Sequence, residues 1–423
     1  MTSERECFVY IVLPGTTEFV TAARFKMTKT RDGVSIGEFV YGKNYLARPD
    51  AVEFDPIELR FGPTEYKTIR MQGFFGAIRD SMPDFWGRRV IERHASRVGF
   101  DEFDYLMLGP DDRAGALGFG LNAEPPMPRR EFNRTLDLES LQNMADAIIN
   151  NDVTRFENHA DIHQVQELLL EGTSMGGARP KAVIEDNNSL WIAKFSSPQD
   201  QWNQPRVELA FLNMAKMCGL QVAESKIISV SGKDVLLVRR FDRDKSDAGY
   251  RRYRMVSALT LLKSDDSPTA RENWSYLSLA DEIRRCSAKP TMDLRELFGR
   301  MCFNAIVSNL DDHPRNHAIL AKEKNWRLSP AYDLTPTPVF AQDSRFLAMT
   351  CGTYGRLARK ENLLTCHGRF LLSREDAEFI IDNIVETVRH EWVSCLRRAG
   401  VCEKDCITIS RAFIYDGFFL PII

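Results

Sequence analysis

The spacing of hydrophobic residues changes from the first half of the chain to the second. Residues 181–184 and 190–195 read as two strands, and Asp186-Asn187-Asn188-Ser189 between them has the composition of a tight turn, which predicts a hairpin. Beyond about residue 246 the apolar positions recur at helical spacing, apart from one strand pair at 317–328. The pattern predicts a β-rich first half and a helical second half, arranged as two lobes around a cleft.

Four further segments have the spacing or the end signals of helices. They are residues 74–95 with an interruption at Pro83, residues 136–171, residues 206–219 ending at Gly219, and a helix that Asp293 is expected to N-cap and that ends by Asn309. The proline-rich stretch 125–130 cannot continue a helix or a central strand. We therefore expect three parts, residues 1–125, 126–245 and 246–423.

Composition places the chain among ordinary globular proteins. Its 423 residues are 43% hydrophobic, which is enough to bury a sizeable core, and 56 Lys and Arg oppose 59 Asp and Glu. The net charge of -3 argues against a dedicated nucleic-acid or membrane-surface binder. We find no apolar run long enough to span a membrane and no layout of a signal peptide. Nine scattered cysteines, an odd number, indicate a reduced, cytoplasmic protein.

A glycine-containing loop at residues 172–180 is the first candidate for ligand chemistry. Gly176 and Gly177 would let the backbone approach a ligand closely, and exposed N–H groups in such a loop can cradle phosphate oxygens. Arg179 and Lys181 add positive charge where the loop ends. On its own, however, a Gly-Gly pair before a strand is more often just a turn.

Lys194 lies in the second strand of the predicted hairpin. Alternation places Trp191, Ala193 and Phe195 on one face, and Ile192 with Lys194 on the other. Both faces are otherwise apolar, so Lys194 is expected to point into a covered space, where a nucleotide phosphate could pair with it and Glu208 could orient it. The alternative is a lysine that snorkels to the surface at a sheet edge.

The strongest chemical signal lies in residues 309–333. Asp311 and Asn316 are five residues apart in one loop, and Asp333 follows an intervening hairpin, so the three side chains can converge. Kinases use this layout, in which one Asp takes the proton of the attacking hydroxyl while the Asn and a second Asp hold Mg²⁺. Asp and Asn are also common in loops and helix caps, so this spacing on its own also occurs by chance in proteins without the activity. Its position after the glycine loop and Lys194, in kinase order, favours catalysis, and His313 is expected to brace the loop.

Several segments together resemble the HipA family of serine/threonine kinases, the toxin halves of bacterial toxin–antitoxin pairs. In matching order these are SMGGARPKA (174–182), WIAKF (191–195), RRFDR (239–243), NLDDHPRNH (309–317) and AYDLTP (331–336). Earlier in the chain, residues 37–56, 83–93 and 115–119 resemble the family's N-terminal subdomain. The resemblance implies an α+β, two-lobed protein-kinase-like fold, with a β-rich N-lobe, an extra N-terminal subdomain and a helical C-lobe.

The resemblance also assigns roles to individual residues. It implies that Ser174 is autophosphorylated and that Lys194 contacts the ATP phosphates. Arg240, Phe241 and Asp242 would lie in the segment that contacts adenine and ribose. Asp311 would be the catalytic aspartate, and Asn316 and Asp333 would be Mg²⁺ ligands. One departure is Arg239, where the family often has Glu, so a nucleotide contact from this side chain stays open.

The function implied is that of an ATP- and Mg²⁺-dependent serine/threonine protein kinase. Family members phosphorylate proteins, among them aminoacyl-tRNA synthetases. They also pair with a small helix-turn-helix antitoxin, HipB, through which DNA is reached indirectly, and no membrane contact is expected. Two other readings stay open. The chain could be a non-catalytic pseudokinase that joins an antitoxin in operon repression, or a small-molecule or lipid kinase.

Overall fold

The computed structural model describes residues 4–150, 179–337 and 344–422. Contacts between residues divide the chain into two compact units. The first unit comprises Met1–Gln199, Ile228–Val256 and Leu320–Lys324, and the second comprises Asp200–Ile227, Ser257–Ile319 and Asn325–Ile423. Residues 200–227, which the sequence division placed in its middle part, therefore group with the mainly helical residues of the second unit.

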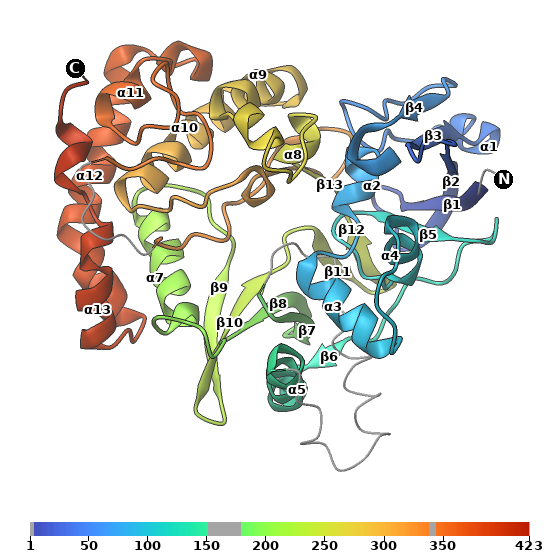
Figure 1. The fold of residues 1–423 in the computed structure, drawn as a ribbon, viewed down its shortest axis with the longest axis horizontal. Coiled ribbons are helices and arrows are strands. Elements are labelled where there is room, and N and C mark those ends of the chain that lie inside the picture. The colour runs from blue at the N-terminus through green and yellow to red at the C-terminus, as the bar shows by residue number, and fades with distance from the viewer. Residues whose placement is uncertain (1–3, 151–178, 338–343, 423) are drawn as a thin grey trace. The chain divides into compact units, whose positions relative to one another are not determined.

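The first unit begins with a five-stranded sheet in the order β4-β3-β2-β1-β5 (Figure 1). Its strands are β1 (Glu4–Val12), β2 (Phe19–Lys29), β3 (Ser35–Tyr41), β4 (Tyr66–Thr68) and β5 (Leu117–Gly120). Short helices accompany it, namely α1 (Lys43–Leu46), α2 (Gly76–Asp80), α3 (Phe85–His94) and α4 (Glu102–Leu108). The predicted interruption at Pro83 is confirmed. Asp84 caps α3 beyond it by accepting a 2.6 Å hydrogen bond from the Gly87 N–H.

A second five-stranded sheet of this unit has the order β6-β7-β8-β10-β9. Its strands are β6 (Asn133–Arg134), β7 (Lys181–Asp186), β8 (Ser189–Phe195), β9 (Ser225–Val230) and β10 (Lys233–Arg239). The predicted hairpin is confirmed, because Asn187 and Asn188 have φ values of 49° and 57° in the turn between β7 and β8. Two positive φ values are what a two-residue type I′ turn requires, and Asn tolerates them.

One face of the second sheet is covered by α5 (Leu138–Asn150) and by α3. The apolar cluster between them contains Trp191, Ala193 and Phe195, so the predicted alternation of β8 is confirmed. Two more short strands, β11 (Arg243–Ser246) and β12 (Gly249–Arg252), pair as a hairpin after β10. Of the helix predicted over 136–171, the structure describes only the part up to residue 150.

The second unit is built mainly from helices. They are α7 (Gln204–Met217), α8 (Ala258–Leu261), α9 (Tyr276–Cys286), α10 (Pro290–Ile306), α11 (Lys360–Leu364), α12 (Arg374–Arg398) and α13 (Glu403–Ile409). Helix α10 is the centre of the core, since most of its side chains are buried and α9 and α12 both pack against it. Helix α12 also packs along α7, as Figure 1 shows.

The expected start of α10 is wrong. The helix begins at Pro290, whose missing N–H suits the first helical turn, and Lys289 occupies the N-cap position. Asp293 therefore lies inside the helix, where it is buried and forms an ion pair with Arg327.

Strands β13 (Arg254–Ser257), β14 (Ala318–Ala321) and β15 (Arg327–Leu328) form a three-stranded sheet in that order. The strand pair predicted at 317–328 is thus confirmed as β14 and β15.

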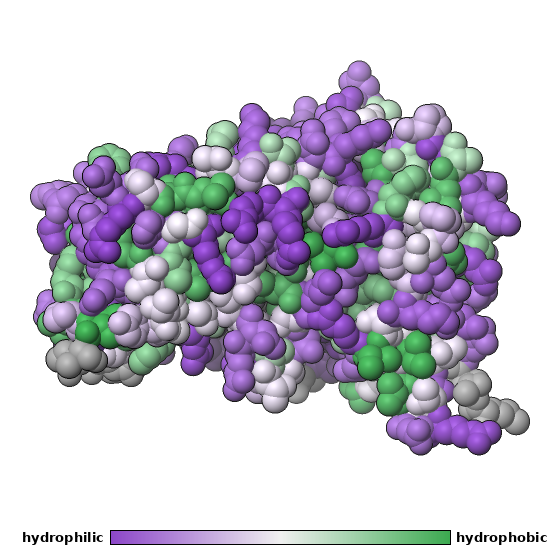
Figure 2. Space-filling view, turned by 90° about the horizontal axis from the view of Figure 1, so that it is seen from above, coloured by the Kyte–Doolittle hydropathy of each residue, from purple (hydrophilic) through white to green (hydrophobic). Residues whose placement is uncertain are grey.

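The surface view in Figure 2 is dominated by hydrophilic side chains, with separate smaller apolar patches between them. Within the ranges that the structure describes, no helix combines the length and the apolar character needed to cross a bilayer.

Candidate active site

The loop that follows α10 presents Asp311 to solvent. The chain leaves the helix at Ile306 and turns through Ser308, whose φ is 55°. Thr337 fixes this turn with two hydrogen bonds. Its N–H donates to the Ser308 carbonyl at 2.8 Å, and its Oγ1 accepts from the Leu310 N–H at 3.0 Å. Asp311 is exposed, and none of the described residues donates a hydrogen bond to its carboxylate. The Asp311 carboxylate is therefore accessible to solvent.

The neighbouring carboxylate, Asp312, is completely buried and braces the same loop. It accepts hydrogen bonds from the Tyr276 hydroxyl and from His317 Nε2, the latter at 2.6 Å. Burial raises the pKa of Asp312, but the contacts with His317 and Tyr276 outweigh that effect and hold the pKa below its ordinary value. Asn304 extends the chain of contacts by donating to the Tyr276 hydroxyl at 3.3 Å. Asp311 and Asp312 thus have opposite environments although they are adjacent.

His313 was expected to brace this loop, and that expectation is wrong. His317 makes the bracing hydrogen bond, while His313 Nδ1 is buried with no hydrogen-bond partner among the described residues. The His313 ring instead lies edge-on to Trp274, with ring centroids 6.3 Å apart. The reason is local geometry, since Pro314 starts a short 3-10 turn, Pro314–Asn316, that carries His317 back toward Asp312.

The two expected magnesium ligands, Asn316 and Asp333, flank one hairpin. Asn316 lies two residues before the start of β14, and Asp333 follows β15. Where these strands pair, the Ser329 N–H donates to the Ala318 carbonyl at 2.9 Å. Beyond the strands, the Tyr332 hydroxyl donates to the Arg315 carbonyl at 2.7 Å. The residues just before Asn316 and Asp333 are therefore in direct contact, so the structure brings these two segments together.

The backbone at Asp333 is unusual, with a φ of 60°. Such left-handed backbone is uncommon outside glycine, and residues held in it cluster at functional sites.

The side chains of Asn316 and Asp333 offer oxygen ligands to a metal ion. Carboxylate and amide oxygens are the ligands that Mg²⁺ prefers, so these two side chains fit this ion. No group of three or more His, Cys, Asp or Glu placed to hold a metal occurs among the described residues. A magnesium ion here would take its remaining ligands from phosphate oxygens and water.

In the first unit, Lys194 lies on β8 directly opposite Lys181 of β7. The ammonium of Lys181 forms a 2.7 Å ion pair with Asp84, and both side chains are almost fully buried. The Trp86 indole N–H also donates to the Lys181 carbonyl at 3.0 Å. Lys194 is partly buried, between the extremes of core and surface. The expected phosphate contact of Lys181 thus meets competition from Asp84, whereas Lys194 occupies the strand position expected for it.

Three other expected residues, Ser174, Gly176 and Gly177, lie outside the described residues.

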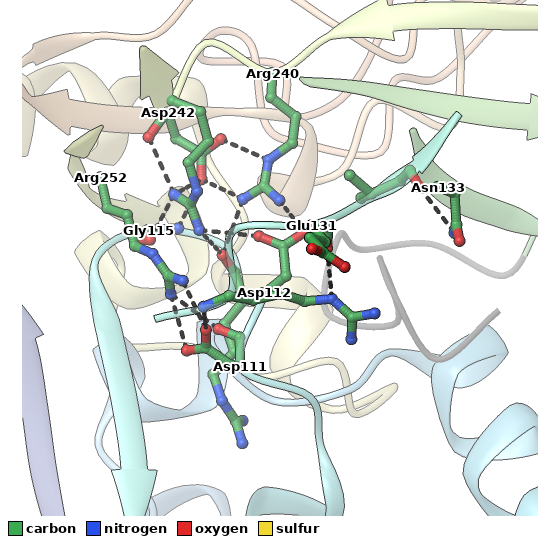
Figure 3. Close-up of polar contacts among 12 residues, drawn as sticks. Asp111, Asp112, Gly115, Glu131, Asn133, Arg240, Asp242 and Arg252 are labelled. Atoms are coloured by element: carbon green, nitrogen blue, oxygen red, sulfur yellow. Dashed lines mark hydrogen bonds and ion pairs between the residues drawn. The ribbon is translucent and has the colours of Figure 1, made fainter. Parts of the chain in front are cut away.

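The segment expected to contact adenine and ribose is dominated by a buried ion network (Figure 3). Arg240 and Asp242 contact one another, with Arg240 Nη2 2.8 Å from an Asp242 oxygen, and Arg240 Nη1 lies 2.5 Å from Asp112. Burial alone would raise the pKa of Asp242, but the guanidinium groups of Arg240 and Arg243 hold it well below its ordinary value. The side chains of Arg240 and Asp242, two of the three residues expected in this segment, are therefore engaged by protein groups.

Sequence reasoning missed the bracing residues Asp312 and His317, and the Asp112 partner of Arg240. The Asp-Asp pair at 311–312 was a usable signal for the first two, because one member of such a pair in a loop can turn inward. Asp112 had no comparable signal, since 128 positions separate it from Arg240.

Comparisons with known proteins show the family to which the chain belongs. The HipA-like C-terminal domain family matches residues 173–392, more than half of the chain, and the chain belongs to this family. It is 29% identical over 277 residues to "Putative kinase Y4mE" of Sinorhizobium fredii (strain NBRC 101917 / NGR234), covering 63% of this chain and 62% of that protein. It is 25% identical over 236 residues to a "Putative kinase" of Haemophilus influenzae, covering 51% and 66%. The matches thus span less than two thirds of either relative.

Among solved structures, HipA of Shewanella oneidensis MR-1, determined in complex with HipB and operator DNA, has a TM-score of 0.67 to this chain. The likeness covers 96% of this chain and 94% of that one at 14% sequence identity. At this identity the likeness shows the fold. It confirms the predicted α+β, two-lobed protein-kinase-like fold and, with the family match, the resemblance to HipA.

Proposed function

We propose that this protein is an ATP- and Mg²⁺-dependent serine/threonine protein kinase. One observation supports this most strongly. The loop after α10 exposes Asp311, and the Tyr332–Arg315 hydrogen bond holds the segments of Asn316 and Asp333 together beside a hairpin. Membership of the HipA-like family, and the names of relatives as kinases, support the same reaction.

In the proposed reaction, Asp311 accepts the proton of the attacking serine or threonine hydroxyl. As the new bond between that oxygen and the γ-phosphorus forms, the bond from phosphorus to the β–γ bridging oxygen breaks, and ADP leaves with the electron pair. Asn316 and Asp333 would hold Mg²⁺, which supplies charge neutralisation of the phosphates. An exposed carboxylate that has no hydrogen-bond partner among the described residues suits a base, whereas buried Asp312 is committed to His317 and Tyr276.

In the first unit, we assign the nucleotide phosphates to Lys194 and to the loop containing Gly176 and Gly177. Lys181 is assigned a supporting role because Asp84 engages its ammonium. For the base and ribose we assign the backbone of residues 239–243 together with Phe241, because the Arg240 and Asp242 side chains are engaged elsewhere.

Ser174 is the proposed site of autophosphorylation. A phosphate there would add roughly -1.5 to -2 charges close in sequence to Arg179 and Lys181 and would reshape the phosphate loop. Peptide mass spectrometry after incubation with Mg·ATP tests this directly, and an ATP affinity that does not respond to Ser174 phosphorylation would count against a switch.

For partners, we propose a cytoplasmic protein substrate and a small helix-turn-helix antitoxin like HipB. The support is the solved HipA, which was determined with HipB and operator DNA. Contact with DNA would then be indirect, through the antitoxin. Aminoacyl-tRNA synthetases are the first substrates to test because of the family resemblance.

The test is transfer of labelled γ-phosphate from ATP to three classes of acceptor, namely the chain itself, added proteins and small molecules or lipids. The proposal expects label on serine or threonine of protein, dependent on Mg²⁺ and abolished in Asp311→Ala. Label only on small molecules or lipids would replace the proposal with the corresponding kinase. Nucleotide binding without any transfer would favour the pseudokinase.

A further inference from the structure

The loop Asp111–Gly115 and the segment Arg240–Arg243 are joined by a dense set of buried contacts. Arg240 reaches Asp112 at 2.5 Å and the Arg113 carbonyl at 2.9 Å. Arg243 donates to the Arg113 carbonyl at 2.5 Å and to the Gly115 carbonyl at 2.7 Å. In the reverse direction, the Gly115 N–H donates to Asp242 at 2.9 Å. The two segments, although more than a hundred residues apart, therefore form one hydrogen-bonded body, as Figure 3 shows.

Charge balance explains why so many ions can be buried here. Two carboxylates, Asp112 and Asp242, face two guanidinium groups, Arg240 and Arg243, and all four side chains are at most 6% exposed. Removing one member would leave an uncompensated buried charge, which is much more costly than the loss of a surface pair. At the edge of the network, Arg252 adds an ion pair with Asp111 at 2.8 Å.

The same loop is anchored deep in the part of the chain that precedes residue 125. Arg113 is fully buried and donates to the carbonyls of Ser81, Leu106 and Gly109 at 3.0, 2.6 and 2.8 Å. Gly115 has a φ of 79°, and a Cβ there would lie 3.3 Å from the Met255 backbone, so a larger residue would push the loop away. The loop is thus held rigidly on both sides.

We propose that Asp112 is a positioning residue for the nucleotide, acting through Arg240 and Arg243 on the backbone of residues 239–243. The inference rests on the proposed function, because it assumes that this backbone contacts the base and ribose. The N-terminal subdomain, residues 1–125, would then set the nucleotide affinity of the kinase part without touching the nucleotide. Strand β10 ends at Arg239, so the segment beyond it depends on this network, together with backbone contacts such as Arg240 N–H to the Leu190 carbonyl, for its conformation.

The test compares Asp112→Asn with a matched control, Glu102→Gln. Like Asp112, Glu102 is a carboxylate of the first unit that pairs with arginines, although it is less deeply buried, with its side chain 18% exposed. Its ion pairs are with Arg88 and Arg79 rather than with arginines of residues 239–243. In full-length protein at temperatures where both variants are folded by circular dichroism, Asp112→Asn should raise KM for ATP on the order of tenfold with kcat little changed. Glu102→Gln should leave KM for ATP unchanged. A merely structural role would lower the active fraction, and hence kcat, in both variants.

A second measurement needs no variant and decides the matter if Asp112→Asn does not fold. Hydrogen–deuterium exchange of the wild-type chain is followed with and without Mg²⁺ and a non-hydrolysable ATP analogue. The proposal expects slower exchange over residues 111–115 as well as over 239–243. Protection confined to 239–243, or an unchanged KM in folded Asp112→Asn, would overturn the inference while leaving the kinase assignment intact. A wild-type chain that binds no nucleotide would overturn both.

Discussion

At the scale of single residues, environment separates chemically identical groups into different roles. Asp311 and Asp312 are adjacent, yet one carboxylate meets solvent and the other is fully buried between Tyr276 and His317. Catalytic groups are often not optimal for stability, whereas a buried carboxylate is tolerated only when its partners compensate for desolvation. Substitutions at Asp311 and at Asp312 can therefore be compared, the first for its effect on activity and the second for its effect on stability.

Replacing Asp312 by Ala should lower the free energy of unfolding by about 3–5 kcal/mol, because it strips a buried partner from His317 and Tyr276. Asp311→Ala should change it by no more than about 0.5 kcal/mol, because the side chain is exposed. Urea unfolding monitored by circular dichroism measures both. Equal losses in the two variants would contradict the distinction drawn between them.

Asp312 should also contribute to the pH dependence of stability. Its pKa is lowered in the folded state, so its stabilising effect is complete above the unfolded pKa of about 3.9 and is lost as the pH falls through the folded pKa. Unfolding free energies of wild type and Asp312→Asn, measured from pH 5 downward, should therefore converge below about pH 4. A difference that stays constant over this range would show that the carboxylate charge contributes nothing.

At the scale of elements, the position of Asp333 depends on how β14 and β15 are tied to helix α10. Asp293 of α10 binds the Arg327 guanidinium at 2.8 Å and accepts from the Leu328 N–H at 3.0 Å, so one helix side chain fixes β15 in two ways. Arg300, also on α10, donates to the Ser329 carbonyl at 2.6 Å. The helix therefore serves as the scaffold for the chain that leads to Asp333.

Asp293→Ala should destabilise the protein by about 2–3 kcal/mol, since it leaves the Leu328 N–H and the Arg327 side chain without this acceptor. It should also weaken Mg²⁺-dependent activity, because Asp333 follows the loosened strand. Asp405→Ala is the control, since Asp405 is similarly buried and accepts from the backbone N–H of Asn203, away from β15. Thermal unfolding and a magnesium titration of activity give the two readouts. A magnesium dependence that shifts equally in both variants would argue against a scaffold role.

At the scale of the whole molecule, the residues proposed to take part in phosphate transfer are divided between two compact units. Lys194 and the Arg240–Asp242 segment belong to the first unit, and Asp311, Asn316 and Asp333 belong to the second. A kinase reaction requires groups of both kinds, one set for the nucleotide and one for the metal and the acceptor. Ligand binding should therefore be visible in the stability of the entire chain.

Mg·ATP at about 100 times its Kd should add about 2.7 kcal/mol of stability and raise Tm by roughly 3 °C. The shift should shrink when EDTA removes the metal and also in Asp333→Asn, which would lose a ligand for it. Differential scanning fluorimetry measures these shifts. The same shift with and without EDTA would contradict a role for Mg²⁺ in nucleotide binding.

Patterns that are local in the chain were predictable from the sequence, and long-range partners were not. The Asn187-Asn188 turn and the alternation of β8 follow from nearest-neighbour preferences, and the structure has both. The start of α10 was misplaced because Asp293 looks like a cap, although its actual partner, Arg327, lies 34 positions away. The Asp112–Arg240 pair is likewise invisible in sequence, since nothing local marks which buried charges will meet. The roles of Asp311, Asn316, Asp333 and Lys194 stay predictions.

The most direct test of the kinase assignment is transfer of labelled γ-phosphate from ATP by the full chain, with one variant from each unit. Wild type should transfer label to itself or to protein acceptors, and Lys194→Met and Asp333→Asn should each reduce transfer by at least about 100-fold. The matched controls Lys233→Met and Asp376→Asn, which alter exposed ion pairs with Asp146 and Arg295, should retain wild-type rates. Wild-type transfer by either site variant, or no transfer by wild type at saturating Mg·ATP, would contradict the account.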